Sequence, residues 1–192
     1  MPVKILAFAG STGTRSLNKK LVGHAAQLAR LQGAEVRLID LKSYPLPLYD
    51  SDLERESGVP DNALAIRTLM VESEGILVSC PEYNSAISGV LKNTIDWVSR
   101  PVPDQAALAA FTGKTVALLA ASPGRLGGIR TLASVRSILS SLGMIVVPKQ
   151  YCLGLANAAF DDNDTLIDES AHRGVCAVVE QLIEVTESLG GL

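Results

Sequence analysis

A chain of 192 residues that is 47% hydrophobic and 19% charged is long enough to bury one core and too apolar to be disordered. Its net charge of -3 gives no electrostatic reason to expect a nucleic acid or an acidic membrane surface as a partner. We therefore expect a single domain, 1–192, with a small ligand.

The cysteines and the hydropathy pattern indicate the compartment. Cys80, Cys152 and Cys176 are odd in number and form no CxxC pair, which argues against a disulfide framework and a zinc site. No segment approaches the ~20 apolar residues that span a bilayer, and no secretory leader pattern is present. We expect reduced thiols, no membrane segment and a cytoplasmic location.

Apolar runs and helical patterns alternate from the start of the chain. Residues 3–9 form an apolar, β-branched run that ends at Gly10, as expected for a strand buried on both faces. The spacing over 18–32 predicts a helix that Gly33 ends, and 36–41 predicts a second strand.

The segment 42–60 interrupts this alternation. It contains three prolines and shows no periodicity, and it is longer than most connections in compact domains. We interpret it as a functional flap or a partner contact.

The alternation resumes after the flap. Asp61 is expected to cap a helix, and residues 75–79 to form a third buried strand. Strands are also predicted over 115–121 and 144–148, and helices over 88–98, over 128–142 and from near Asp168. This pattern implies right-handed crossovers and a parallel sheet that is covered on both faces.

The loop after the first strand, from Gly10 to Asn18, combines glycines, hydroxyl side chains, an arginine and the free N–H groups of a helix start. These features favour an anion. Because neither GxxxxGK[ST] nor GxGxxG is present, a terminal monophosphate fits better than a nucleotide. The alternative is a polar turn in which Ser16 or Asn18 only caps the helix.

Two later loops also follow strands. After 75–79, Tyr83 could present its ring to a flat ligand, with the N–H groups of 82–84 along the ligand's edge. After 115–121, three glycines between Ser122 and Gly128 permit close backbone approach to a ligand. Taken alone, these loops are also explained as an ordinary turn and a glycine-rich connection.

The first two loops become neighbours if the strands lie in the order 2-1-3-4-5. This flavodoxin-like order places FMN where the chain order reverses. We therefore predict an α/β fold: a flavodoxin-like three-layer sandwich with a five-stranded parallel sheet of order 2-1-3-4-5 and helices on both faces.

These loops also resemble those of the NADPH-dependent FMN reductase family, which includes flavodoxin-like quinone, azo and chromate reductases. The first loop is similar to the family's GSxRxxSxN, and the second to PEYNxSxPGxLKNAIDW. The matching positions are Gly10, Ser11, Ser16 and Asn18, then Pro81 to Asn84, Gly89, 91–93 and 95–97, and, in a third flavin-facing loop, Ser122 to Gly124 with Gly127 and Gly128.

The sequence departs from the family pattern at two positions. Gly13 stands where the family usually has the loop arginine, so Arg15 is expected to reach the phosphate instead. Ser88 stands where the family usually has a proline before Gly89.

The resemblance implies an enzyme, an FMN-dependent NAD(P)H oxidoreductase. It would take a hydride from NAD(P)H, as co-substrate, onto bound FMN and pass two electrons to a flavin, quinone, azo or metal-oxyanion acceptor. A homodimer or homotetramer is implied as well, with no catalytic side chain and no metal. The expected cofactor contacts are Ser11, Arg15, Ser16, Leu17, Asn18, Pro81, Glu82, Tyr83, Asn84, Ser122 and Gly124.

Two other functions remain open at this point. One is a flavodoxin-type electron carrier that holds FMN without oxidising NAD(P)H, although such carriers tend to be strongly acidic. The other is a flavin-free phosphate-binding or nucleotide-binding module.

Several residues are interpreted as structural. His24 and His172 are expected on helix surfaces, Cys80 as a small buried hydrophobe and Asp40 as a strand-end acid. Trp97 is expected to anchor the core or an interface.

Overall fold

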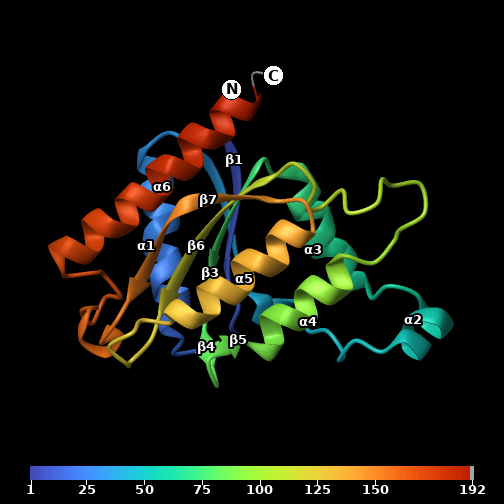
Figure 1. Ribbon diagram of the computed structural model, residues 1–192, viewed down its shortest axis with the longest axis horizontal. Helices are drawn as coiled ribbons and strands as arrows, with labels where there is room; N and C mark the ends of the chain where they lie inside the picture. The colour runs from blue at the N-terminus through green and yellow to red at the C-terminus, as the bar shows by residue number, and fades with distance from the viewer. Residues whose placement is uncertain (191–192) are drawn as a thin grey trace.

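A five-stranded parallel sheet forms the centre of the computed structural model, which describes residues 1–190 (Figure 1). Its strand order is β2-β1-β3-β6-β7, with every neighbouring pair parallel. The strands are β1 (Lys4–Ala9), β2 (Glu35–Ile39), β3 (Gly75–Ser79), β6 (Thr115–Ala121) and β7 (Ile145–Leu153). Counted over these five strands, the order is 2-1-3-4-5, so the predicted flavodoxin-like fold is confirmed.

Helices cover both faces of the sheet. One face packs against α1 and α6, and the other against α3, α4 and α5. In Figure 1, α1 and α6 lie to the left of the sheet and α3 and α4 to its right. Their bounds are α1 (Leu17–Leu31), α3 (Asp61–Glu72), α4 (Gly89–Val98), α5 (Ile129–Ser141) and α6 (Glu169–Gly190). No helix within residues 1–190 is long and apolar enough to cross a bilayer.

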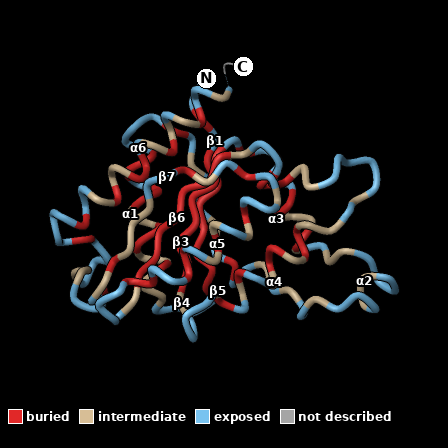
Figure 2. Tube along the Cα trace, in the orientation of Figure 1, coloured by how far each residue is buried: buried red, intermediate tan, exposed pale blue. Residues whose placement is uncertain are grey.

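The central strands are buried on both faces, which explains their continuous apolar runs. Ile5 and Leu77 face α1 and α6, whereas Leu6 and Ile76 face the opposite helices. Every residue of β3 and β6 is buried, and Figure 2 shows this as a continuous buried zone through the middle of the sheet. The loops that line the site leave this buried layer at the carboxyl ends of its strands.

The segment 42–60 contains more regular structure than its sequence indicated. A 3-10 turn covers Leu41–Ser43, and a short helix, α2, covers Ser51–Ser57. The Asp50 side chain caps α2 by accepting from Asp52 N at 2.8 Å. No residue of α2 is buried. A seven-residue helix without a buried face leaves no apolar periodicity in the sequence, so the pattern did not reveal it.

Two boundaries differ from the prediction. Asp61 does not cap α3: Pro60 holds the cap position without a side-chain hydrogen bond, and Asp61 lies in the first turn, where its charge favours the helix dipole. The last strand continues to Leu153 instead of ending at 148. A register shift between Val116 and Leu118 allows β7, at the sheet edge, to continue pairing past its proline.

Candidate functional site

The loops that follow β1, β3, β6 and β7 enclose an open cleft at the carboxyl edge of the sheet. Its volume is about 470 Å³, which is typical of small-molecule sites. All the expected cofactor contacts line it except Asn84 and Gly124. The lining residues are Ser11, Gly13, Arg15, Ser16, Leu17, Asn18, Pro81, Glu82, Tyr83, Ala121, Ser122, Pro123 and Asn157.

The loop between β1 and α1 presents unpaired main-chain donors beside this cleft. Ser16 caps α1, and its Oγ accepts from Lys19 N at 3.3 Å. In the described part of the chain, no acceptor is found for the main-chain N–H groups of Ser11, Thr12, Thr14, Arg15, Leu17 and Asn18. Unpaired N–H groups at a helix start make a site for an anion.

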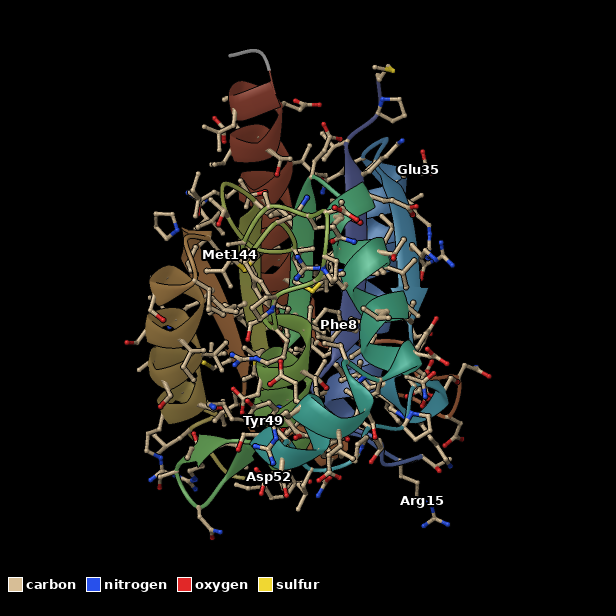
Figure 3. The ribbon with its side chains drawn as sticks, turned by 90° about the vertical axis from the view of Figure 1, so that its right-hand side faces the viewer. Phe8, Arg15, Glu35, Tyr49, Asp52 and Met144 are labelled. Carbon is tan, nitrogen blue, oxygen red and sulfur yellow. The ribbon has the colours of Figure 1, made fainter. Side chains whose placement is uncertain are left out.

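Arg15 supplies the loop's guanidinium. It lines the cleft, is exposed to solvent, and projects away from the ribbon at the lower edge of Figure 3. The guanidinium has no ion-pair partner among residues 1–190, in contrast to Lys19, whose ammonium lies 2.7 Å from Asp40. Arg15 is therefore free to meet an anion in the cleft.

Close packing under the loop explains why position 10 is a glycine, and hydrogen bonds explain why position 88 is a serine. A Cβ atom on Gly10 would lie 2.7 Å from the Cβ of Leu91 in α4. The Ser88 hydroxyl donates to the Gly10 carbonyl at 2.7 Å, and it also accepts from Leu91 N at 3.2 Å as the cap of α4. Ser88 thus joins the loop between β1 and α1 to α4, which a proline at this position could not do.

Asn18 connects three of the loops. Its Nδ2 donates to the Ala121 carbonyl at 2.9 Å, and its Oδ1 accepts from Ala121 N at 2.9 Å and from Ser79 Oγ at 2.8 Å. The side chain is therefore committed to the ends of β3 and β6. What Asn18 leaves for a ligand is its unpaired main-chain N–H.

Glu82 also acts within the protein. Its carboxylate accepts from Arg130 Nε at 2.8 Å, from Arg130 N at 3.0 Å and from Thr131 N at 3.2 Å, so it caps the start of α5. Burial of the carboxylate favours its neutral form, but Arg130 and the N–H of Thr131 outweigh burial and hold the pKa of Glu82 below its ordinary value. Only the main chain of Glu82 remains for a ligand.

The predicted loop around Tyr83 is a two-stranded hairpin. Strands β4 (Glu82–Tyr83) and β5 (Ala86–Ile87) are antiparallel, and Asn84 and Ser85 join them with φ angles of 51° and 65°. Asn-Ser is a weaker signal than Asn-Gly for this turn, so the hairpin was not foreseen. Asn84 lies at the hairpin tip outside the cleft lining, and Tyr83 is 63% exposed beside it.

The second half of the long motif holds the 42–60 flap. Asn93 Nδ2 and Trp97 Nε1 both donate to the Pro47 carbonyl at 2.8 Å, and Asn93 Oδ1 accepts from Tyr49 N at 2.8 Å. The rings of Tyr49 and Trp97 pack edge to face with centroids 5.0 Å apart, and Figure 3 shows Tyr49 beside Asp52 of α2. Trp97 is fully buried against its own chain, so its ring anchors the core.

Residues treated as structural remain apart from the cleft lining. His24 Nε2 lies 3.2 Å from His172 Nδ1, a contact between α1 and α6 that their sequence positions did not suggest. Burial, together with the nearby His172, lowers the pKa of His24. Burial strongly raises the pKa of the Cys80 thiol and keeps it in its neutral form. Residues 1–190 contain no cluster of three or more His, Cys, Asp or Glu side chains suited to a metal.

Asn157 belongs to the cleft but to no motif in the sequence. It lies in the 3-10 turn Ala156–Ala158, after the carboxyl end of β7. Its only sequence signal was a polar side chain shortly after a strand, and the strand itself was predicted to end five residues too early.

Known proteins resemble the chain over most of its length. The family model described as NADPH-dependent FMN reductase matches residues 3–158. An NAD(P)H-dependent FMN reductase of Pseudomonas aeruginosa is 34% identical over 170 residues, which cover 88% of this chain and 87% of that protein. A quinone reductase of Escherichia coli strain K12 is 33% identical over 153 residues, covering 79% and 77%.

A solved structure extends the likeness to three dimensions. FerB of Paracoccus denitrificans, a flavoenzyme NAD(P)H:(acceptor) oxidoreductase, superimposes with a TM-score of 0.82 at 25% identity. The match covers 97% of this chain and 98% of that structure.

We predict that Asn18→Ala destabilises the ligand-free protein by about 3 kcal/mol, because it leaves both main-chain groups of Ala121 buried without their partner. Chemical denaturation measures this as a loss in the free energy of unfolding. Asn62→Ala removes a single exposed hydrogen bond to the Pro45 carbonyl and is the matched control, with an expected loss under about 1 kcal/mol. Equal losses in the two variants would contradict the connecting role of Asn18.

We predict that Glu82→Gln lowers stability in a pH-dependent way. The pKa of Glu82 is lowered in the folded protein from an ordinary value of 4.5, so its contribution is present above pH 4.5 and is lost as the pH falls through the folded pKa. The variant should therefore be less stable than the wild type by about 1–2 kcal/mol at neutral pH, with a gap that closes in acid. Glu169→Gln, which removes an exposed pair with Arg173, is the control and should show no such trend.

Proposed function

Because the chain belongs to the NADPH-dependent FMN reductase family, we propose that the cleft at the carboxyl edge of its sheet is the site where it oxidises NAD(P)H. The protein is an NAD(P)H-dependent FMN/quinone oxidoreductase with FMN as its cofactor. The acceptor that we propose is a flavin, a quinone, an azo compound or a metal oxyanion. The observation that carries the site is the set of unpaired N–H groups between Ser11 and Asn18.

These residues fit the phosphate of FMN. A phosphate needs several donors, and the loop offers main-chain N–H groups together with the hydroxyls of Ser11 and Ser16. The positive end of α1 and the Arg15 guanidinium balance the phosphate charge. Arg15 would thus contact the phosphate in place of the family's loop arginine, whose position is held by Gly13 in this sequence.

The remaining walls suit a flat ring. Tyr83 offers an exposed aromatic face beside the cleft, and Pro81, Ser122 and Pro123 line it. Tyr83 and Ala86 flank the two-residue turn and form the hydrogen-bonded pair, so the N–H of Glu82 points away from β5 and is available to a ligand. We propose that this N–H stabilises negative charge at the ring edge.

The chemistry that FMN supplies when bound is two-electron transfer, from the hydride of NAD(P)H to the second acceptor. The protein's part is to hold the loops in place. The side chains of Asn18 and Glu82 fix three of them to the sheet and to α5, which keeps the donors in position before any ligand arrives.

We also propose that residues 1–192 act as one FMN-binding domain in a cytoplasmic homodimer or homotetramer. Exposed apolar side chains near the cleft, among them Leu126, Ile129 and Leu155, support a second subunit close to the site. A monomeric mass in gel filtration would contradict the assembly.

We predict that Arg15→Gln weakens FMN binding by about 10-fold and leaves riboflavin binding unchanged, because riboflavin lacks the phosphate. Quenching of flavin fluorescence on titration of ligand-free protein measures both affinities. Arg173→Gln, which changes an exposed arginine on α6, is the matched control. A parallel loss for both flavins would mean that Arg15 acts on the ring or on folding instead of on the phosphate.

We predict that NADPH or NADH, mixed anaerobically with the FMN-loaded protein, removes the visible flavin absorbance, and that added quinone restores it. Free FMN at the same concentration is the control for uncatalysed reduction. A flavin that stays oxidised with both nucleotides would identify an electron carrier. Protein that binds no FMN would favour a flavin-free binding module.

A further inference from the structure

Asn157 is the polar residue of the cleft that neither the sequence motifs nor the proposed phosphate and ring contacts use. It lies at the centre of the turn Ala156–Ala158, and its side chain is exposed to the cleft. Its position follows β7, the outermost of the four strands whose loops form the site.

The side chain of Asn157, like those of Arg15 and Tyr83, makes no hydrogen bond among residues 1–190, whereas the other hydrogen-bonding side chains of the cleft do. Asn18 and Glu82 are committed to strands and helix starts, and the hydroxyls of Ser11, Ser16 and Ser122 each accept from a nearby main-chain N–H. The Asn157 amide has no hydrogen-bond partner in the described part of the chain. It therefore offers two N–H donors and a carbonyl acceptor to whatever the cleft binds.

The main chain around Asn157 is held firmly. Leu155 N donates to the Gly124 carbonyl at 3.2 Å, and Ala156 N donates to the Ser122 carbonyl at 3.1 Å. Ala156 is fully buried, and Gly154 is packed so closely on the Arg125 carbonyl that a Cβ could not fit. The turn is thus attached to the β6 loop on the cleft wall. A free amide on a fixed turn loses little entropy when it binds a ligand.

We propose that Asn157 is a positioning residue that pairs with the amide edge of a ring bound in the cleft. An asparagine amide is complementary to a group in which a C=O stands beside an N–H, because each partner then donates and accepts once. Two ligands of the proposed function carry such an edge: the pyrimidine of the flavin and the carboxamide of the nicotinamide. The inference rests on the proposed function, since both ligands belong to it.

The test uses ligands that lack the N–H in question. The FMN arm titrates ligand-free protein with FMN and with 3-methyl-FMN and follows flavin fluorescence. The co-substrate arm compares KM for NADPH with KM for its reduced 3-acetylpyridine analogue, using FMN-saturated enzyme. The variants are Asn157→Ala, Asn157→Gln as the conservative replacement, and Asn163→Ala, an exposed asparagine outside the cleft lining, as the control.

We expect Asn157→Ala to lose about 5-fold, the worth of one net hydrogen bond, in one arm. The loss should vanish with the analogue in that arm, Asn157→Gln should regain part of it, and Asn163→Ala should match the wild type. A loss confined to FMN binding identifies the flavin as the partner, and a loss confined to KM identifies the nicotinamide. Because the side chain is exposed and unbonded, the free energy of unfolding should not change.

Two other outcomes would contradict the proposal. No loss in either arm, or the same loss for a ligand and its analogue, would overturn the role of Asn157 and leave the proposed function intact. Wild-type protein that binds no FMN would overturn the proposed function, and this inference with it.

Discussion

The buried hydrogen bonds of Asn18 determine where the parts of the site stand relative to one another. Parallel strands end at a common edge, but the loops that leave them have no ladder to keep their spacing. The Asn18 amide joins the start of α1 to the ends of β3 and β6, so three of the loops share one reference point. The unpaired N–H groups before α1 and the hairpin after β3 are placed through this connection.

Side chains and main chain have different roles at the carboxyl edge of the sheet. Side chains that stand out in the sequence, among them Asn18, Glu82, Ser88, Asn93 and Trp97, make contacts within the protein, whereas the groups that face the cleft come largely from the main chain. Recognition by main-chain donors depends on loop shape more than on side-chain identity. The first loop can therefore carry Gly13 in place of an arginine and still present main-chain donors beside the cleft.

The sequence was most informative where burial imposed a long, simple pattern. The apolar runs at 3–9, 75–79 and 115–121 became strands in the predicted order, and most of the expected contacts line one cleft. The sequence does not predict the hairpin or α2, because each is too short to show a periodic pattern of apolar residues. The side-chain hydrogen bonds of Asn18 and Glu82 could not be predicted for another reason. Their partners lie 103 and 48 residues away, and no local pattern records such contacts.

The anchored flap has a consequence for how the protein can vary. Its attachment to α4 is made at Pro47 and Tyr49, and the helix that follows, Ser51–Ser57, buries none of its residues. Additional peptide inserted into that helix would lengthen a feature that the hydrophobic interior does not use. The region is a natural place to graft an affinity tag or a fluorescent label, because such an addition leaves the packed core unchanged.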